Sequence, residues 1–326
     1  MVKVAIQYIT RKFCRYILSF FIIITLNFFI PRLMPGDPFI NILGEEFYYA
    51  DPELVEGLKT KYGLNKPLHE QYIAYLINLA HCNWGYSFHY MQPVFDVIAL
   101  RLKWTLLLLM PSIVLGTIIG MIAGSIAGWR NKSKLDIGVT STFLLIYSMP
   151  HYWLAMLFVL IFAFHLNLFP LGGICSGESE GLERLIDILW HMGLPVLVLT
   201  LFNASYKHLI MRNSVVQVLE EDFIVTARAK GLKDRAILFK HVLKNALLPL
   251  VTIVALDFGF MVSGTLLVEI VFSWNGMGTL IYDAVIARDY PILQGCFLIT
   301  AVCVLVANFL ADIGYAILDP RVRGER

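Results

Sequence analysis

Long apolar stretches alternate with shorter polar segments along the whole chain. Six stretches hold about 20 consecutive, mostly apolar residues, the length that a helix needs to cross the hydrocarbon core of a bilayer. These predicted spans cover residues 13–31, 104–128, 137–165, 188–209, 246–270 and 292–318. The first stretch follows basic residues but precedes no small-residue cleavage site, so we predict a retained span rather than a signal peptide.

Composition agrees with this pattern. Of the 326 residues, 58% are hydrophobic and 15% are charged, whereas soluble proteins average about 45–50% apolar and about 25% charged residues. The chain is therefore predicted to be an all-α polytopic membrane protein. Its five cysteines form no Cys-x-x-Cys pair, so we expect small apolar residues rather than a zinc site or a disulfide framework.

The charges of the connecting segments predict the orientation. Lysine and arginine are concentrated before the first span, after the second and fourth spans, and in the tail, whereas residues 33–100 and 166–187 are rich in acids. By the positive-inside rule, both termini and residues 219–245 are expected to be cytoplasmic. The outer segment, residues 32–103, is expected to form short helices, at 51–62 and 70–81, over the outer mouth.

Residues 220–249 form a charged, amphipathic block between two apolar spans. Residues 219–230 are predicted to form a short helix with acids at its start and basic residues at its end, which suits the helix dipole. Gly231 is predicted to be a left-handed C-cap, and Asp234 the N-cap of a second helix that runs towards Ala246, before Pro249. An apolar face is expected to press into a groove on a partner: Phe223, Ile224, Ala227, Ile237, Leu238 and Val242. The alternative is an interfacial helix that lies on anionic lipid.

Several motifs resemble those of one family, in order and spacing. In the first half these are Pro35-Gly36-Asp37-Pro38, Tyr62-Gly63-Leu64-Asn65-Lys66-Pro67, Trp84-Gly85-Tyr86-Ser87-Phe88, Ser148-Met149-Pro150 and Phe169-Pro170-Leu171-Gly172-Gly173. In the second half they are Thr226-Ala227-Arg228-Ala229-Lys230-Gly231-Leu232, Val268-Glu269-Ile270-Val271-Phe272-Ser273-Trp274, Ala287-Arg288-Asp289-Tyr290-Pro291 and Leu318-Asp319-Pro320-Arg321-Val322-Arg323. The chain resembles the B-type permease subunits of the dipeptide, oligopeptide and nickel branch of ABC importers.

The resemblance implies a type I ABC-importer transmembrane domain and a site of coupling to an ATPase. Residues 1–97 would hold the first helix and an extracytoplasmic segment, residues 98–318 five helices with the coupling segment 219–245, and residues 319–326 a cytoplasmic tail. The residues that would couple to the ATPase are Asp222, Thr226, Ala227, Arg228, Ala229, Lys230, Gly231 and Leu232. The later half of the motif departs from the general ABC-importer pattern, because His241 and Lys244 stand where isoleucine and proline are usual.

The resemblance also implies partners and cargo. These would be a related C-type permease subunit, two ATP-binding subunits and an extracytoplasmic solute-binding protein, in the cell membrane of a prokaryote, with no role for nucleic acid. The chain has no P-loop, no His-Glu-x-x-His motif and no Gly-x-Ser-x-Gly motif. We therefore expect no catalysis and no cofactor on this chain, with ATP bound by partner subunits. The expected cargo is a di- or oligopeptide, with nickel as the alternative, and a secondary transporter or channel is the rival class.

Two acids are candidates for the translocation pathway or its gate. Asp257 lies near the middle of the fifth span, where an acid costs about 2.5–3.5 kcal/mol on insertion scales, so it is expected to face a cavity or the bundle interior. It would line the path, or else act as a packing acid bonded to serine, threonine or another subunit. Glu269, before Trp274, is a candidate outer gate, with interfacial anchoring by Trp274 as the alternative.

Three further features concern helix packing, ion pairing and metal binding. Gly116, Gly120, Gly124 and Gly128 put a smooth stripe on one helix face, which favours close helix packing over a substrate role. Asp312 is expected to pair with a basic residue of the cytoplasmic rim. His81, Cys82 and His89 could receive a metal ion, although their spacing matches no defined metal motif.

Overall fold

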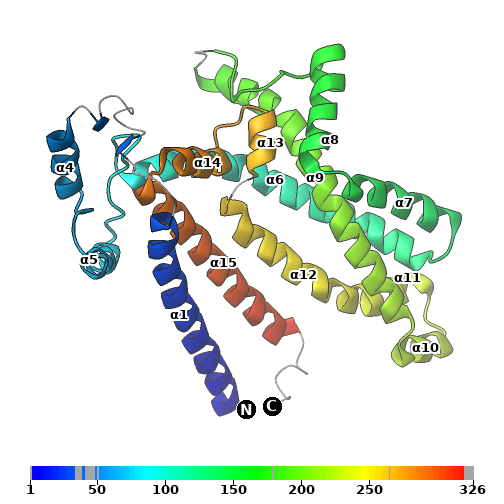
Figure 1. Cartoon of the computed structure of the whole chain (residues 1–326). Coiled ribbons are helices and arrows are strands. Elements are labelled where there is room, and N and C mark those ends of the chain that lie inside the picture. Colours follow the sequence, from blue (N-terminus) through cyan, green and yellow to red (C-terminus); the bar gives the residue numbers. More distant parts are fainter. Residues whose placement is uncertain are drawn as a thin grey trace. The chain divides into compact units, whose positions relative to one another are not determined.

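The computed structural model describes residues 2–33, 39–40, 48–49, 51–177, 180–263 and 265–318, and within these ranges the side chains of residues 2–14, 263 and 310–318 are left out. The described chain is built from helices (Figure 1). The tail, the motif Pro35–Pro38 and the side chain of Asp312 therefore lie outside the described part.

Within the described ranges, five helical segments are long and apolar enough to cross a membrane, and a bent pair of helices provides a sixth candidate. The long helices are α1 (Val2–Arg32), α6 (Val94–Trp129), α9 (Gly181–Leu219), α12 (Leu243–Phe260) and α15 (Tyr290–Leu318). Two shorter helical elements precede α12 without a break, so that its helical segment begins at Asp234. The polytopic all-α prediction is confirmed. Most of these helices extend beyond the apolar residues of the predicted span, because polar residues continue the helix without interrupting its backbone hydrogen bonds.

The third predicted span is not one straight helix. It consists of α7 (Lys134–Ser148), α8 (His151–Phe158) and the π-helix η1 (Val159–His165), and the two halves are bent by 99°. Met149, which precedes Pro150, has an extended backbone with ψ of 138°. A proline disfavours the helical conformation of the residue before it, so the break follows from Pro150.

The fifth predicted span also ends earlier than expected. α12 stops at Phe260 and is followed by a 3₁₀ turn, η3 (Met261–Ser263), and a separate short helix, α13 (Leu266–Val271). Apolar composition alone could not locate this end, since the residues on both sides of it are hydrophobic.

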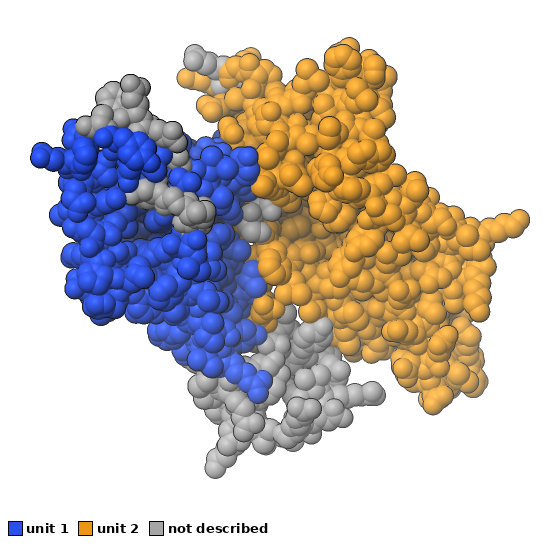
Figure 2. Space-filling view, viewed as in Figure 1, with its two compact units in different colours: residues 1–104, 276–305 blue, residues 105–275, 306–326 orange. Residues whose placement is uncertain are grey.

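Two compact units make up the chain (Figure 2). Unit 1 contains Met1–Trp104 and Gly276–Leu305, and unit 2 contains Thr105–Asn275 and Val306–Arg326.

Unit 1 includes α1, α4 (Pro52–Lys61), α5 (Leu68–Ala80), the start of α6, α14 (Met277–Ala287) and the first half of α15. The two predicted outer helices are confirmed to within two residues at each end. The core of the unit joins α6, α14 and α15 through buried Val94, Ile98, Leu280 and Leu293. The short helix α14 was not among the sequence predictions.

Asp289 connects two of the sequence motifs within unit 1. The residue is fully buried, and its carboxylate accepts hydrogen bonds from the Ser87 hydroxyl and from the backbone N–H groups of His89 and Ile292. The motif around Asp289 thus starts α15 and fastens it to the segment around Ser87. This arrangement satisfies a buried charge that would otherwise be costly.

Unit 2 is organised around α9, which packs against α7, α8 and α12. It also includes α10 (Asp222–Ala229), α11 (Asp234–Ile237) and the π-helix η2 (Leu238–Val242), which leads into α12. This unit holds the predicted coupling segment and both acids of the predicted pathway.

Candidate functional site

The predicted coupling segment forms a helix, a turn and a second helix. α10 begins at Asp222, because α9 continues without interruption to Leu219, so the predicted start of this helix at residue 219 is wrong by three residues. Gly231 has φ of +74°, which confirms the predicted left-handed turn. The turn is closed by the backbone N–H of Gly231, which donates to the Arg228 carbonyl at 2.9 Å.

The second helix of the segment is much longer than predicted. Lys233, rather than Asp234, occupies the N-cap, and α11, η2 and α12 run together as one 27-residue segment from Asp234 to Phe260. Pro249 therefore lies inside a helix rather than at the entrance of a new one. Local π-type adjustment and neighbouring helices allow proline inside membrane helices, since they satisfy the backbone groups that it leaves free.

The predicted docking face is largely wrong. Ile224, Ala227, Ile237 and Val242 are buried in the core of unit 2, where they pack with residues of α9 and α12 that include Met211 and Leu250. These residues were expected to contact a partner protein. They lie on one face of the helices, as predicted, but that face packs against α9 and α12 of the same chain. The amphipathic pattern identified the apolar face, but it could not show whether a partner or the chain's own helices cover that face.

The outward side of the segment carries a different apolar set. We call it the coupling surface and define it as Phe223, Val225, Leu232 and Phe239, which are 40%, 62%, 41% and 67% exposed. Exposed basic residues surround it: Arg228, Lys230, Lys233, Arg235 and Lys240. Among the predicted coupling residues, Ala227 is buried, whereas Asp222, Thr226, Arg228, Ala229, Lys230, Gly231 and Leu232 are exposed. Asp222 and Asp234 are exposed as well, so the segment presents apolar residues among charges of both signs, with basic residues in excess, and its other side is packed into α9 and α12.

Asp257 lies three residues before the end of α12, not near the middle of the helix as predicted, and forms an ion pair with α9. Its Oδ2 is 2.7 Å from Nζ of Lys207, whose side chain is fully buried, while the Asp257 side chain is 27% exposed. Lys207 Nζ also donates to Oδ1 of Asn203 at 3.1 Å. Asp257 is thus bonded to another helix, as in the packing alternative, although its partner is a lysine of the same chain. Because its side chain is partly exposed, the pathway role stays a prediction.

Glu269 is fully buried on α13. Its Oε1 accepts hydrogen bonds from the Thr105 hydroxyl at 3.2 Å and from the Thr265 backbone N–H at 3.4 Å. Trp274 is also fully buried, so the alternative that it anchors the chain at the membrane surface is wrong. The gate role of Glu269 stays a prediction, although its carboxylate lies inside unit 2 rather than on its surface.

The glycine stripe packs α6 closely against α9. A Cβ atom on Gly120 would lie 2.6 Å from the Ala204 carbonyl oxygen, and one on Gly124 would lie 2.6 Å from that of His208. Such distances are below van der Waals contact, so no larger residue fits without a shift of the helices. The packing prediction for the stripe is confirmed.

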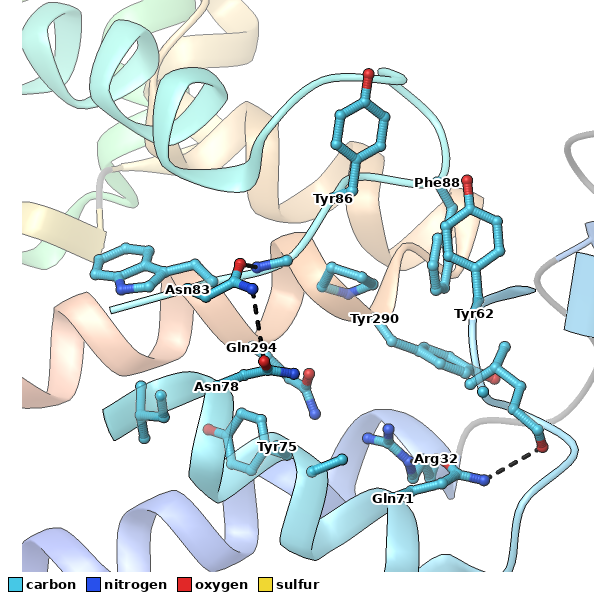
Figure 3. A pocket seen from close by; sticks show the side chains of 18 of the residues that line it. Arg32, Tyr62, Gln71, Tyr75, Asn78, Asn83, Tyr86, Phe88, Tyr290 and Gln294 are labelled. Carbon is cyan, nitrogen blue, oxygen red and sulfur yellow. Dashed lines mark hydrogen bonds between the residues drawn. The ribbon is translucent and has the colours of Figure 1, made fainter. Parts of the chain in front are cut away.

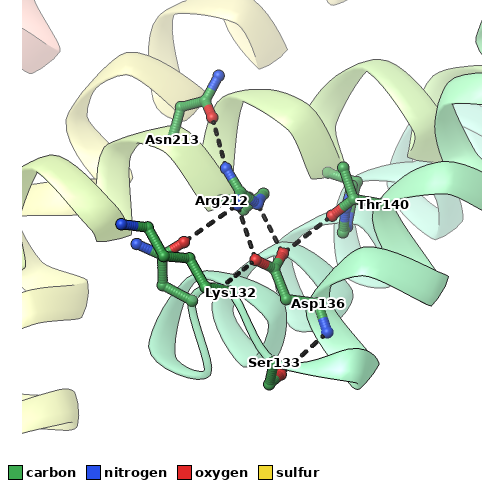
Figure 4. Close-up of polar contacts among 8 residues, drawn as sticks. Lys132, Ser133, Asp136, Thr140, Arg212 and Asn213 are labelled. Atoms are coloured by element: carbon green, nitrogen blue, oxygen red, sulfur yellow. Dashed lines mark hydrogen bonds and ion pairs between the residues drawn. The ribbon is translucent and has the colours of Figure 1, made fainter.

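An ion pair that the sequence analysis missed joins α7 to α9 (Figure 4). Arg212 approaches both carboxylate oxygens of Asp136, with Nε and one Nη each at 2.7 Å. Asp136 also accepts bonds from the Lys132 backbone N–H and the Thr140 hydroxyl, while Ser133 caps α7. Asp136 was the one acid among three basic residues after the second span, a signal that could have indicated a specific partner.

A cavity of about 250 Å³ lies within unit 1 (Figure 3). Aromatic and amide side chains make up half of its lining residues, and Lys66 and Arg32, the last residue of α1, also line it. The Arg32 guanidinium donates to Gln71 Oε1 at 3.1 Å and to the Phe28 carbonyl at 2.9 Å. Burial raises the pKa of the Tyr75 phenol, which therefore stays neutral.

The candidate metal residues do not form a site. Within the described ranges, no group of three or more His, Cys, Asp or Glu side chains is placed to hold a metal ion. Nδ1 of His81 lies 2.8 Å from the carbonyl oxygen of Ile77, one turn earlier in its own helix.

Comparison with known proteins identifies the family. Residues 5–109 match the model of the N-terminal part of the membrane component of binding-protein-dependent transport systems, and residues 116–324 match the model of their inner membrane component. The latter has the type I ABC-importer transmembrane fold.

Named relatives align over almost the whole chain. The oligopeptide transport system permease protein AppB of Bacillus subtilis is 36% identical over 97% of this chain and 98% of the relative. The di/tripeptide transport system permease protein DppB of Pseudomonas aeruginosa is 33% identical over 98% of this chain and 100% of the relative. A putative peptide permease protein of Brucella suis is 35% identical over 91% and 93%. The chain therefore belongs to the family of inner membrane components of binding-protein-dependent transport systems.

Proposed function

We propose that this chain is the permease subunit of an ATP-driven importer of di- or oligopeptides. The relatives that align along its length are named as oligopeptide, di/tripeptide and peptide permeases, and no observation favours nickel, the alternative cargo. Both termini and the coupling segment face the cytoplasm in this proposal. A second permease subunit completes the pathway, two ATP-binding subunits supply the energy, and an extracytoplasmic binding protein delivers the peptide.

The observation that carries the coupling role is the two-sided packing of residues 222–242. On the inner side, Ile224 and Ile237 are fully buried against α9 and α12. On the outer side, Phe223, Val225, Leu232 and Phe239 of the coupling surface are exposed. Exposed apolar residues on a segment that is fixed to two membrane helices suit a partner whose closure is to move those helices.

Alternating access then follows from differential contact. A partner can shift the helices between two arrangements only if it binds them more tightly in one arrangement than in the other. Because ATP is bound by the partner subunits in this proposal, the chain itself needs no nucleotide and no cofactor. In this proposal, the chain contributes the coupling segment and half of the translocation pathway.

The experiment replaces an exposed apolar residue of the coupling surface. We expect Val225→Asp and Phe239→Asp to abolish ATP-dependent peptide uptake and co-purification of the ATP-binding subunits, because a charge would be buried at the contact. Leu54→Asp on α4, a residue 46% exposed, is the matched control and should leave both readouts unchanged. Normal uptake and normal co-purification in the two coupling-surface variants would refute the proposed contact.

A further inference from the structure

Helix α5 is fastened to α1 by a buried polar and aromatic contact. The Tyr72 and Thr25 hydroxyls are 2.8 Å apart, and the Asn27 amide donates to the Tyr75 hydroxyl at 3.3 Å. The ring of fully buried Phe28 lies against both tyrosines, with centroids 5.1 and 5.6 Å apart. The two helices are therefore joined along two turns of α1.

This contact lies inside the apolar span of α1. The span covers Arg15–Arg32, and Thr25 precedes Arg32 by seven residues, which is about 10 Å along a helix. Other side chains of the same turns, Leu26 and Ile30, are 52% and 50% exposed, as expected of residues that face lipid. α5 is consequently held at the level of the membrane rather than above it.

The two sides of α5 differ in chemistry. One side lines the cavity of unit 1 with Gln71, Tyr75 and Asn78 (Figure 3). The opposite side exposes Ile73 and Ile77, each 54% exposed, and helical spacing places Glu70 in the same stripe. The charged residue of α5 is Glu70, in the first turn, and the last turn holds no basic residue.

The direction of α5 also matters. In Figure 1, α5 is seen down its axis, whereas α1 runs in the plane of the picture, so the two helices cross steeply. A helix that crosses a spanning helix steeply lies along the membrane plane. Interfacial helices adopt this orientation, with their apolar face about 5–10 Å deep in the boundary between headgroups and acyl chains.

We propose that α5 is embedded in the membrane interface at the Arg32 end of α1, with Ile73 and Ile77 in contact with lipid, Glu70 of the same stripe at the level of the headgroups, and the cavity behind the helix. Lipid is the occupant that fits, because the side chains that join α5 to α1 lie within the apolar span of α1. The Thr25 and Tyr72 hydroxyls and the Asn27 amide nitrogen have partners at this contact, as polar groups at membrane depth require, whereas Oδ1 of Asn27 is buried without one. In the orientation proposed above this is the outer leaflet, but the inference holds for any cargo.

Spin-label accessibility tests the depth of α5. Single cysteines at Ile73 and Ile77, in a chain whose native cysteines are replaced by alanine, would be spin-labelled in the importer reconstituted in phosphatidylethanolamine–phosphatidylglycerol vesicles. Leu26→Cys on α1 is the lipid control and Leu54→Cys on α4 is the water control. The quantity measured is the accessibility of the spin label to oxygen divided by its accessibility to a water-soluble nickel chelate. At positions 73 and 77 we expect this ratio to equal that at position 26 and to exceed that at position 54 severalfold.

Two outcomes would overturn the inference. A ratio equal to that at Leu54 would place α5 in water, and low accessibility to both reagents would show that a protein partner covers the face. A photoreactive amino acid at Ile77 in the chain with its native cysteines gives a second readout, in which cross-links to lipid are expected and cross-links to protein alone would contradict the inference. Neither readout depends on peptide uptake, so failure here is distinct from failure of the proposed transport function.

Discussion

Lys207 on α9 and Asp257 on α12 form an ion pair of 2.7 Å in unit 2, with the lysine side chain fully buried. Lys207 also packs against α6, since a Cβ atom on Gly120 would lie 2.8 Å from that of Lys207. The pair therefore joins α9 to the helix that continues the coupling segment. Asp257, which the sequence suggests as a pathway residue, therefore has Lys207 as its ion-pair partner.

The first prediction concerns this ion pair. Asp257→Asn should lower the free energy of unfolding by up to about 3 kcal/mol, because it leaves the buried Lys207 charge without its partner. The double variant Lys207→Gln/Asp257→Asn should recover part of that loss in thermal unfolding of the purified protein in detergent. If the double variant also recovers uptake, Asp257 acts through packing, whereas stable protein without uptake would support the pathway role.

The second prediction concerns the glycine stripe. Gly124→Ala should destabilise the protein by about 1–3 kcal/mol, because the added methyl group would meet the His208 carbonyl and the Met211 side chain at 2.6 and 2.8 Å. The control is Gly138→Ala on α7, where an added Cβ has nothing within 4 Å. Equal melting temperatures for the two variants would argue against close packing of α6 on α9.

The third prediction concerns the contact between Asp136 and Arg212. Arg212→Lys keeps the charge but loses the two parallel bonds to the carboxylate, so its stability should lie between those of the wild type and Arg212→Met. Thermal unfolding of the three proteins would give this order. Arg228→Lys, at an exposed position of α10, should leave the melting temperature unchanged, and a wild-type value for Arg212→Met would contradict the role of the pair.

The fourth prediction concerns the turn at Gly231. Gly231→Val should abolish uptake while membrane insertion stays normal, since a β-branched residue is strained at φ of +74°. Gly231→Asn should keep most of the activity, because asparagine tolerates the left-handed conformation. Gly231→Asp, which adds a charge beside the coupling surface, should abolish uptake without loss of insertion. Transport at the wild-type level by the valine variant would show that the turn is not needed.

The amino-acid sequence alone determined the class of the protein and the existence of its helices. Apolar runs of sufficient length can only be stable in a bilayer as helices, and Gly231 could be assigned to a left-handed turn from its place after a helical period. The glycine spacing likewise predicted close packing, because a four-residue repeat lies on one face of any helix. These features depend on neighbours along the chain.

The tertiary structure decided which surfaces are covered and which charges meet. Ile224 and Ile237 have the pattern of a docking face, and only the position of α9 and α12 shows that the chain buries them itself. Asp136 and Arg212 are 76 residues apart, and Asp257 meets Lys207 from a different helix. No local pattern encodes such partners, because the pairing of side chains across a bundle depends on how the helices are arranged in space.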